Sequence, residues 1–220
     1  MNALNKPAMA GAVAANYRSP INITVARTLS DIMQIVAVRA VVYMSEQDCP
    51  FHEEYDGNDF GGDTHLIARV EGEPVGVLRL RWFADFAKLE RLAVLREHRG
   101  GRTTFMLIDA AFDLAARKGY RKIAGHAQPR LVPFWIRKYN GRIRPGRPTF
   151  MFSDYEYTEV EADLIPPPDA VSIDTDPMVL LRPEGEWDRP GVLDRSAARA
   201  KGFGGWGSCA SPFPRLTTAG

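Results

Sequence analysis

The 220-residue sequence contains only two cysteines, Cys49 and Cys209, and no apolar run close to the roughly 20 residues that a membrane-spanning helix requires. Two cysteines do not make a disulfide framework, so we expect a reducing, cytoplasmic location. Charge of a single sign is also lacking, because 28 basic side chains nearly cancel 27 acidic ones. This balance excludes a surface that coats a polyanion, and 45% hydrophobic residues exclude general disorder.

Metal-ligand spacing is absent as well. The four histidines and two cysteines are not spaced as in metal sites, so we predict no metal. No stretch interleaves basic and aromatic residues as a nucleic-acid platform does, so we predict neither a nucleic-acid nor a membrane partner. A literal GxGxxG at 202–207 has no strand before it and no room after it for a dinucleotide domain, which argues against a cofactor motif there.

Composition and periodicity divide the chain into three regions. Residues 1–20 carry small residues, prolines and no periodicity, which predicts a flexible N-terminal arm. Residues 21–164 alternate strand-like and helix-like stretches, the pattern of one α/β domain. Residues 165–220 are rich in proline and glycine, which predicts an extension and not a second domain. Within it, residues 178–182 could form a strand that joins the main sheet or pairs across a homodimer.

Two stretches have strong helical periodicity. The first spans Leu29–Met44, where Thr28 and Asp31 resemble a capping box and Arg39 falls inside the apolar stripe, so it needs a partner. The second spans Thr103–Lys118 and is predicted to bury Phe105, Ile108, Phe112 and Ala115.

Alternating apolar stretches predict the strands. We expect them at Thr64–Val70, Val75–Trp82, Lys88–Leu95, Ile123–Ala127, Arg142–Arg144 and Thr149–Val160, with a short helix at Val132–Tyr139. In the third of these strands, alternation would place Glu90, Leu92 and Val94 on one face.

Opposite charges gather in different parts of the sequence. Between Arg39 and Arg69 there are seven acidic residues and no lysine or arginine. From Arg96 to Arg147, thirteen basic residues face three acidic ones. The acidic part suits a cation and the basic part a polyphosphate, although two solvated loops of opposite charge are an equal alternative.

A Gly-Gly turn leads into the second of these helices. A strand, a short turn and a helix N-terminus present unpaired N–H groups and the positive end of a dipole, which suit an anion. Side-chain donors of two arginines and two threonines stand at the same place. The residues predicted to hold the anion are Arg99, Gly100, Gly101, Arg102, Thr103 and Thr104.

Leu92-Ala93-Val94, followed by residues 97–101 and a long helix, resembles the acetyl-CoA pyrophosphate motif of the GCN5-related N-acetyltransferases (GNAT). The likeness covers roughly residues 21–164. Further matches resemble the ElaA-like branch of that family, namely Arg39, Glu46, Glu54, Asp56 and the triplet His126-Ala127-Gln128. A weaker likeness extends to the acyl-homoserine-lactone synthases, which have a related fold.

The resemblance implies a curved mixed sheet, flanked by helices, that is splayed between its fourth and fifth strands. It implies acetyl-CoA as co-substrate, with the pantetheine arm in the splay and the pyrophosphate on residues 99–104. The backbone of the fourth strand and two aromatic side chains of the last helix would complete the cofactor site, namely Leu92, Ala93, Val94, Phe134 and Trp135.

The phosphate loop and the last helix each depart from the family pattern. Arg102 and Thr104 occupy positions where the family has glycine or alanine, and Arg102 could crowd the diphosphate or give it a charged hydrogen bond. Trp135 occupies the position where the family often has a tyrosine that protonates the departing thiolate. An indole cannot do this, so Tyr139 or water would have to serve.

Amine acetylation requires an uncharged nitrogen, so some group must take the ammonium proton. Glu90 is the first candidate, because partial burial is expected to raise its pKa; the alternative is that it pairs with a nearby arginine and is structural. His126 is the second, near the end of a strand that borders the splay, and the alternative is a hydrogen-bonded structural histidine.

The acidic segment is the candidate acceptor site. Glu54 and Asp56 would attract a cationic acceptor, whereas Arg39 and Glu46 would organise the acceptor loop. The sequence therefore predicts an N-acetyltransferase that passes acetyl directly to the primary amine of a small molecule or peptide. Two alternatives stay open: a donor with a longer acyl chain, as in the lactone synthases, and a non-catalytic CoA-binding protein.

Overall fold

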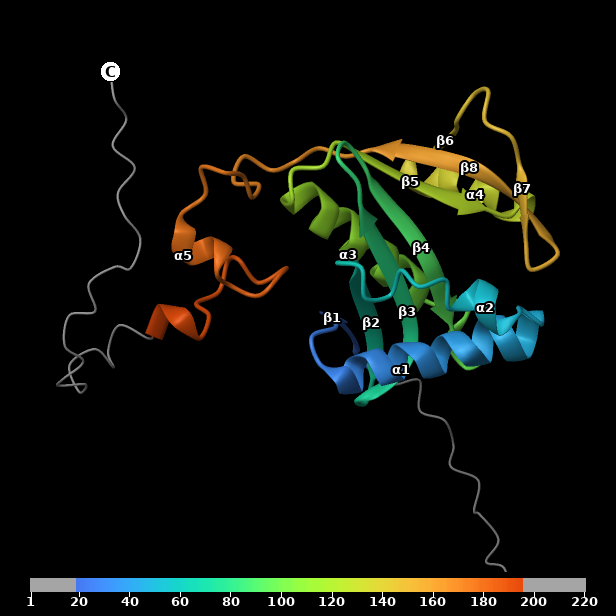
Figure 1. Cartoon of the computed structure of the whole chain (residues 1–220), viewed down its shortest axis with the longest axis horizontal. Helices are drawn as coiled ribbons and strands as arrows, with labels where there is room; N and C mark the ends of the chain where they lie inside the picture. The colour runs from blue at the N-terminus through green and yellow to red at the C-terminus, as the bar shows by residue number, and fades with distance from the viewer. Residues whose placement is uncertain (1–18, 196–220) are drawn as a thin grey trace, which may run out of the picture.

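The computed structural model describes residues 19–195. The expected arm at residues 1–18, Cys209 and the GxGxxG at 202–207 lie outside the described residues. The elements, labelled in Figure 1, are β1 (Ile21–Val25), α1 (Leu29–Arg39), α2 (Phe51–Glu54), β2 (Thr64–Val70), β3 (Glu73–Trp82), β4 (Ala87–Val94), α3 (Thr103–Arg117), β5 (Lys122–Ala127), α4 (Val132–Tyr139), β6 (Arg142–Ile143), β7 (Phe150–Phe152), β8 (Tyr155–Asp163) and α5 (Pro177–Leu180).

One open sheet organises the described chain. Its strand order is β1-β2-β3-β4-β5-β8-β6, and β7 also pairs with β8. Neighbouring strands are antiparallel except β4 and β5, which are parallel. This confirms the predicted mixed α/β sheet.

Helices cover both faces of the first four strands. On one face, α3 buries Leu107, Ile108 and Ala111 in the main core, where Leu78 and Leu80 of β3 also lie. On the other face, α1 forms a smaller core with the sheet, made of Ile35, Val38, Val42, Ile67, Val77 and Ala93. Figure 1 shows α1 crossing the strands in front while α3 lies behind them.

The first predicted helix is confirmed and contains an irregularity. Thr28 and Asp31 form the capping box, since the side chain of each residue accepts a hydrogen bond from the backbone N–H of the other. Beyond Arg39 the helix widens into a π-helix at Ala40–Ser45. Such widening is frequent at functional sites, and here it changes the direction of the side chains that follow Arg39.

The predicted buried stripe of α3 is only partly right. Ile108 and Ala115 are buried, whereas Phe105 is exposed and Phe112 is half-buried. The sheet also buries Leu107, Ala111 and Leu114. These three residues are spaced four and three positions apart, so they lie on the same face of α3, which packs against the strands.

A β-bulge in β4 makes the predicted strand alternation wrong. Val77 pairs with Ala93 and Arg79 with Glu90, so β4 has one extra residue there. Arg91 has a φ of 50°, which is the left-handed conformation of a bulge residue. The extra residue reverses the alternation, so Leu92 and Val94 face α3 while Glu90 faces the opposite side.

Two further predictions for the second half of the chain are wrong. Residues 149–160 are not one strand, because Ser153 and Asp154 adopt positive φ values and turn the chain between β7 and β8. Residues 178–182 are not a strand, because Asp176 caps the short helix α5 and Pro177 suits its first turn. The strand-paired homodimer therefore loses its structural basis.

The described part of the C-terminal region packs beside the ends of α3 and β2. The Glu184 carboxylate accepts a hydrogen bond from the Thr64 hydroxyl at 2.6 Å and pairs with Lys118. The Arg117 guanidinium lies 5.3 Å from the Trp187 ring centroid. These contacts tie residues 184–187 to the ends of α3 and β2.

The capping box should make stability depend on pH. Hydrogen bonds from the backbone of Arg27 and Thr28, and from the side chains of Thr28 and Arg69, lower the pKa of Asp31 from 3.8 to about 2, although burial opposes them. Because the folded pKa is depressed, this stabilisation is present above pH 3.8 and is lost as the pH falls toward 2. We expect Asp31→Asn to lower the free energy of unfolding by about 1–2 kcal/mol at pH 7 and by almost nothing near pH 2, measured by urea denaturation. An equal difference at both pH values would contradict this.

Candidate active site

A gap between β4 and β5 is the centre of the candidate site. The two strands pair only through Ala87–Leu89 and Ile123–Gly125, although β4 continues to Val94. At the last pair the strands approach closely, since a Cβ on Gly125 would lie 3.2 Å from the Leu89 carbonyl oxygen. Beyond it they part, as the predicted splay requires.

The backbone of β4 points its free edge into this gap. The Leu95 N–H donates to the Val75 carbonyl of β3, so by alternation the backbone groups of Leu92 and Val94 are directed away from β3. Their carbonyls accept side-chain hydrogen bonds: the Tyr43 hydroxyl donates to Leu92 at 2.9 Å, and Arg99 Nε donates to Val94 at 2.7 Å. The N–H groups of the same two residues therefore face the gap.

The loop after β4 has the geometry of an anion site at the start of α3. Gly100 has a φ of +70°, which favours glycine, and Arg102 at the N-cap position makes no side-chain cap. Thr103 is buried, whereas Arg99 and Arg102 are exposed. A hollow of about 520 Å³ lies beside this loop, lined by Ser19, Pro20, Ile21, Val70, Glu97, His98, Arg99, Gly101, Arg102, Thr103 and Met106.

Arg99 and Glu46 form an ion pair across the site. Arg99 Nη1 lies 2.7 Å from the Glu46 carboxylate, and Arg96 is 3.7 Å from the same carboxylate. The hydrogen bond from Arg99 and its charge lower the pKa of Glu46. The structure thus links the predicted phosphate loop to the end of the π-helix.

Glu90 is not the base that the sequence suggested. Its carboxylate lies 2.5 Å from Lys88 Nζ and 2.6 Å from Arg79 Nη2. Burial alone would raise the pKa of Glu90, but the hydrogen bonds and charges of Lys88 and Arg79 outweigh it and lower the pKa. The expectation of a raised pKa is wrong, and a carboxylate paired in this way is a weak base.

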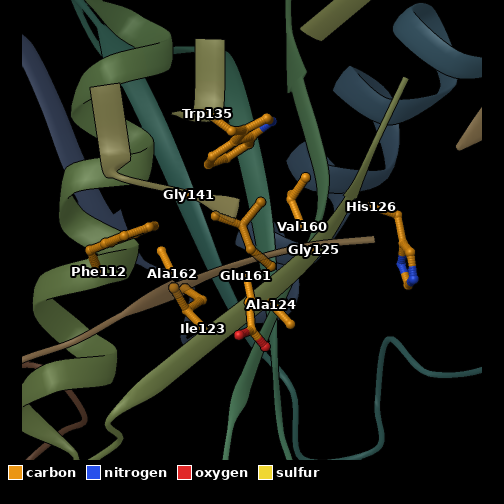
Figure 2. A pocket seen from close by; sticks show the side chains of 11 residues that line it. Phe112, Ile123, Ala124, Gly125, His126, Trp135, Gly141, Val160, Glu161 and Ala162 are labelled. Atoms are coloured by element: carbon orange, nitrogen blue, oxygen red, sulfur yellow. The ribbon is translucent and has the colours of Figure 1, made fainter. Parts of the chain in front are cut away.

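His126 has the properties of a proton acceptor. It is half-buried on β5, its ring meets Phe150 edge-on at 4.7 Å, and burial followed by the charge of Lys88 lowers its pKa below 6.5. The imidazole is therefore neutral at pH 7. Figure 2 shows the His126 side chain apart from those of Phe112 and Trp135.

Tyr139 and the other aromatic residues of α4 lie on the side of the sheet that α3 covers. The Tyr139 hydroxyl donates to Asp109 of α3 at 3.1 Å, and its ring packs against Phe112, Phe134 and Trp135. Burial and the neighbouring Asp109 carboxylate raise the pKa of Tyr139. Its proton is held by α3, which leaves Tyr139 poorly placed as an acid for the gap.

A small apolar cavity lies between this aromatic cluster and β5. It has a volume of about 30 Å³. Figure 2 labels the side chains around it, which come from α3, β5, α4 and β8.

The acidic segment is neutralised by arginines inside the protein. Arg39 and Glu54 are 1% and 0% exposed and pair with each other, and Arg79, also 0% exposed, lies 2.7 Å from Asp56 and 2.9 Å from Asp59. Burial would raise the pKa of Asp56, but the hydrogen bonds from Arg79 outweigh it and lower the pKa. These charges compensate one another, which contradicts the prediction that Glu54 and Asp56 attract a cationic acceptor. Arg39 holds the segment that contains Glu54 and Asp59 in place.

The hairpin between β7 and β8 is a part of the site that the sequence did not predict. At its tip, the Ser153 N–H donates to the Glu53 carboxylate at 3.0 Å and the Ser153 hydroxyl donates to the Gln47 carbonyl at 3.3 Å. The Arg91 guanidinium lies 4.8 Å from the Phe152 ring centroid. The tip thus joins the β5 side of the gap to the segment around α2. The alternating aromatics of residues 150–157 were the available signal.

Two kinds of feature are absent from the part of the chain that the structure describes. No group of histidine, cysteine and carboxylate side chains within residues 19–195 could hold a metal ion. No helix there is long and apolar enough to span a membrane.

Comparisons with known proteins agree with this geometry. Residues 31–140 match the model of the family described as Acetyltransferase (GNAT) family. Among curated proteins, the uncharacterized N-acetyltransferase YjcF of Bacillus subtilis is 31% identical over 120 residues, which are 54% of this chain and 84% of that protein.

Solved structures match the same region. An acyl-CoA N-acyltransferase from Pseudomonas aeruginosa has a TM-score of 0.60 at 22% identity, over 65% of this chain and 99% of its own. Escherichia coli ElaA has a TM-score of 0.58 at 17% identity over the same shares. The CoA-dependent acyl-homoserine lactone synthase BjaI has a TM-score of 0.52 at 15% identity, over 62% of this chain and 77% of its own. These likenesses establish the fold.

Removing Arg39 should test the buried ion pairs. Arg39→Met would leave the Glu54 carboxylate buried without its main partner, which typically costs about 3–5 kcal/mol. Arg81→Met is the matched control, because Arg81 is a quarter exposed and its carboxylate partners are 3.6 and 3.9 Å away, so about 0–1 kcal/mol is expected. Urea denaturation of both variants measures the difference, and equal stability of the two would contradict the assignment.

Proposed function

Because the chain belongs to the acetyltransferase (GNAT) family, we propose that it transfers acetyl from acetyl-CoA directly to the primary amine of a small molecule or peptide. The observation that carries the proposal is the gap between β4 and β5, into which the N–H groups of Leu92 and Val94 point. An extended amide-containing arm can add to such an edge as a strand would.

The residues present fit a diphosphate-bearing thioester. The first N–H groups of α3 have no side-chain cap, and exposed Arg99 and Arg102 stand beside them. Arg102 replaces the small residue of the family pattern, and its exposed side chain is free to turn outward from the backbone. When bound, acetyl-CoA supplies the activated acyl carbon; the protein supplies position and proton transfer.

The direct transfer needs two protein groups. His126, neutral at pH 7, takes a proton from the incoming ammonium or from the attacking amine. A backbone N–H of β4 in the gap, near Val94, stabilises the oxyanion that forms when nitrogen attacks the thioester carbon. Glu90 holds Lys88 and Arg79 beside this position and does not act as the base.

The size of the apolar cavity favours a short acyl group. The cavity next to the last β4–β5 pair has a volume of about 30 Å³ and includes Leu89 and Gly125 in its lining. A long acyl chain could not enter this cavity without rearrangement of its lining. A longer acyl donor, as in the lactone synthases, is therefore the second candidate, and an acyl-CoA series separates the two.

Acetyl-CoA binding is the first test. Calorimetry should detect binding of acetyl-CoA to the wild-type protein, and Arg99→Ala should weaken it by about 1.5–3 kcal/mol, the scale of a charged hydrogen bond. Arg96→Ala is the control from the same loop, because the Arg96 side chain is 75% exposed. No heat at millimolar acetyl-CoA from folded protein would end the proposal, whereas binding without thiol release across a broad amine panel would indicate a CoA-binding protein that is not an enzyme.

The base is tested by pH dependence. Lys88, Glu90 and Glu159 are the charged groups that act on His126, and burial with Lys88 sets its pKa below 6.5. The ionisation of His126 should therefore not change kcat/KM around pH 7. We expect kcat/KM to fall as the pH drops below the pKa of His126, because the imidazolium cannot accept a proton. His126→Gln should lower kcat/KM about 10²- to 10⁴-fold and abolish that acidic limb, whereas exposed His52→Gln should not. Retention of the limb in His126→Gln would exclude His126.

A further inference from the structure

The reaction releases a thiolate, and the residues that the sequence offered to protonate it do not serve. Trp135 has an indole, which cannot act as an acid here. The Tyr139 hydroxyl already donates a hydrogen bond to Asp109 on the α3 side of the sheet. Cys49 is buried, and burial raises the pKa of its thiol. A hydroxyl that opens on the gap from the other side would fill this role, and resting on the proposed function, we infer that Tyr157 of β8 is the general acid that protonates the departing thiolate.

The strand registers place Tyr157 at the level of the reaction. Leu89 and Gly125 form the last β4–β5 pair, and Leu92 and Gln128 each lie three residues beyond it on their own side of the gap. The bulge at Arg91 takes up one of these three residues in β4, and parallel strands rise by about 3.3 Å per residue, so Leu92 stands level with Ala127, next to Gln128, where the strands part. Gln128 Nε2 donates to the Tyr157 hydroxyl at 3.3 Å, which fixes that hydroxyl beside Gln128.

A tyrosine hydroxyl therefore stands on each side of the gap, and of the two only Tyr157 has an O–H that is not already donating a hydrogen bond within residues 19–195. Tyr43 donates its proton to the Leu92 carbonyl. Tyr157 accepts from Gln128, and within residues 19–195 no acceptor takes its own proton. Arg130 Nε donates to Gln128 Oε1 at 2.8 Å, which orients the amide so that its N–H₂ group faces Tyr157.

The surroundings of Tyr157 hold the ring and stabilise its conjugate base. The ring packs against Phe150 and Phe152, and Phe152 in turn lies under the Arg91 guanidinium of β4. Burial raises the pKa of Tyr157 above 10, which keeps it protonated at neutral pH, while the Gln128 hydrogen bond and the charges of Arg91 and Arg130 oppose the shift. The same donor and charges would stabilise the phenolate that forms on proton transfer.

The step balances in atoms and charge. The amine nitrogen bonds to the thioester carbon, its proton passes to His126, and the carbonyl oxygen carries the negative charge of the intermediate. When the carbon–sulfur bond breaks, sulfur takes its electron pair and the proton from Tyr157 Oη. The phenolate regains a proton from solvent, to which His126 returns the one that it took, so an amine and a thioester give an amide and a thiol.

Removing the hydroxyl alone tests the assignment. Tyr157→Phe keeps the ring between Phe150 and Phe152, so the fold and the affinity for acetyl-CoA should be retained, with a lower melting temperature from the lost Gln128 hydrogen bond. We expect kcat for thiol release to fall about 10- to 100-fold, the lower range for general acids, because a thiolate leaves more readily than an amine or alkoxide. Tyr155→Phe is the matched control, since Tyr155 lies on the same hairpin, is 42% exposed and is not bonded to Gln128.

The pH profile separates an acid from a merely structural tyrosine. The wild-type kcat should fall at alkaline pH as Tyr157 ionises, and this limb should be missing in Tyr157→Phe. Replacing Tyr157 with a fluorotyrosine keeps the hydroxyl and should move the limb to lower pH by the drop in the phenol pKa, which gives a second measurement if Tyr157→Phe does not fold.

Each outcome decides the matter. A kcat for Tyr157→Phe within twofold of Tyr155→Phe, or a limb that fluorotyrosine does not move, would assign the proton to water and overturn the inference while leaving the proposed function intact. A wild-type protein that transfers no acyl group from any acyl-CoA would overturn the proposed function and the inference together.

Discussion

The bulge at Arg91 is the constraint on which the candidate site depends. A left-handed residue in a strand costs about 1–2 kcal/mol, and contacts of the Arg91 side chain offset it: the guanidinium lies 3.1 Å from Glu54 and 3.0 Å from Asp56, and it donates to the Glu53 carbonyl at 2.8 Å. One extra residue turns the end of β4 so that Leu92 and Val94 present their backbone to a gap, not to β5.

The segment around α2 keeps Arg91 in this conformation through the contacts just given, and buried ion pairs hold that segment in place. Arg39 and Arg79 are enclosed by carboxylates from residues 54–63 and by Glu90, so the segment around α2 is fixed to the sheet by charge, without an apolar core of its own. Its far side receives the tip of the β7–β8 hairpin through Ser153. The two sides of the gap are therefore joined above it by the hairpin.

Much of the fold could be predicted from the sequence because local rules decide it. The capping box at Thr28 and Asp31, the periodicity of α3 and the Gly-Gly turn before it depend on residues within a few positions of one another, and the structure confirms them. The prediction that Arg39 needs a partner was also right, because a charge in an apolar stripe is costly unless it is paired. The ordered matches of residues 39–128 predicted the family, which the comparisons confirm.

The roles of individual side chains could not be predicted, because they depend on residues far apart in the chain. Alternation gave Glu90 the wrong face because a bulge in a strand leaves no mark in the spacing of apolar residues. Glu54 and Asp56 look like an acidic surface in the sequence, and only the tertiary structure brings Arg39, Arg79 and Arg91 against them.

By itself, the sequence determined the capping box, the helix α3, most of the strands and the family that the chain resembles. The tertiary structure alone decided how the side chains that carry protons are paired: Tyr139 donates to Asp109 of α3, Glu90 pairs with Arg79, and Tyr157 accepts from Gln128. The physical reason is that proton affinity is set by burial and by charges within a few ångströms, and in this sheet those charges come from strands and loops up to a hundred residues apart.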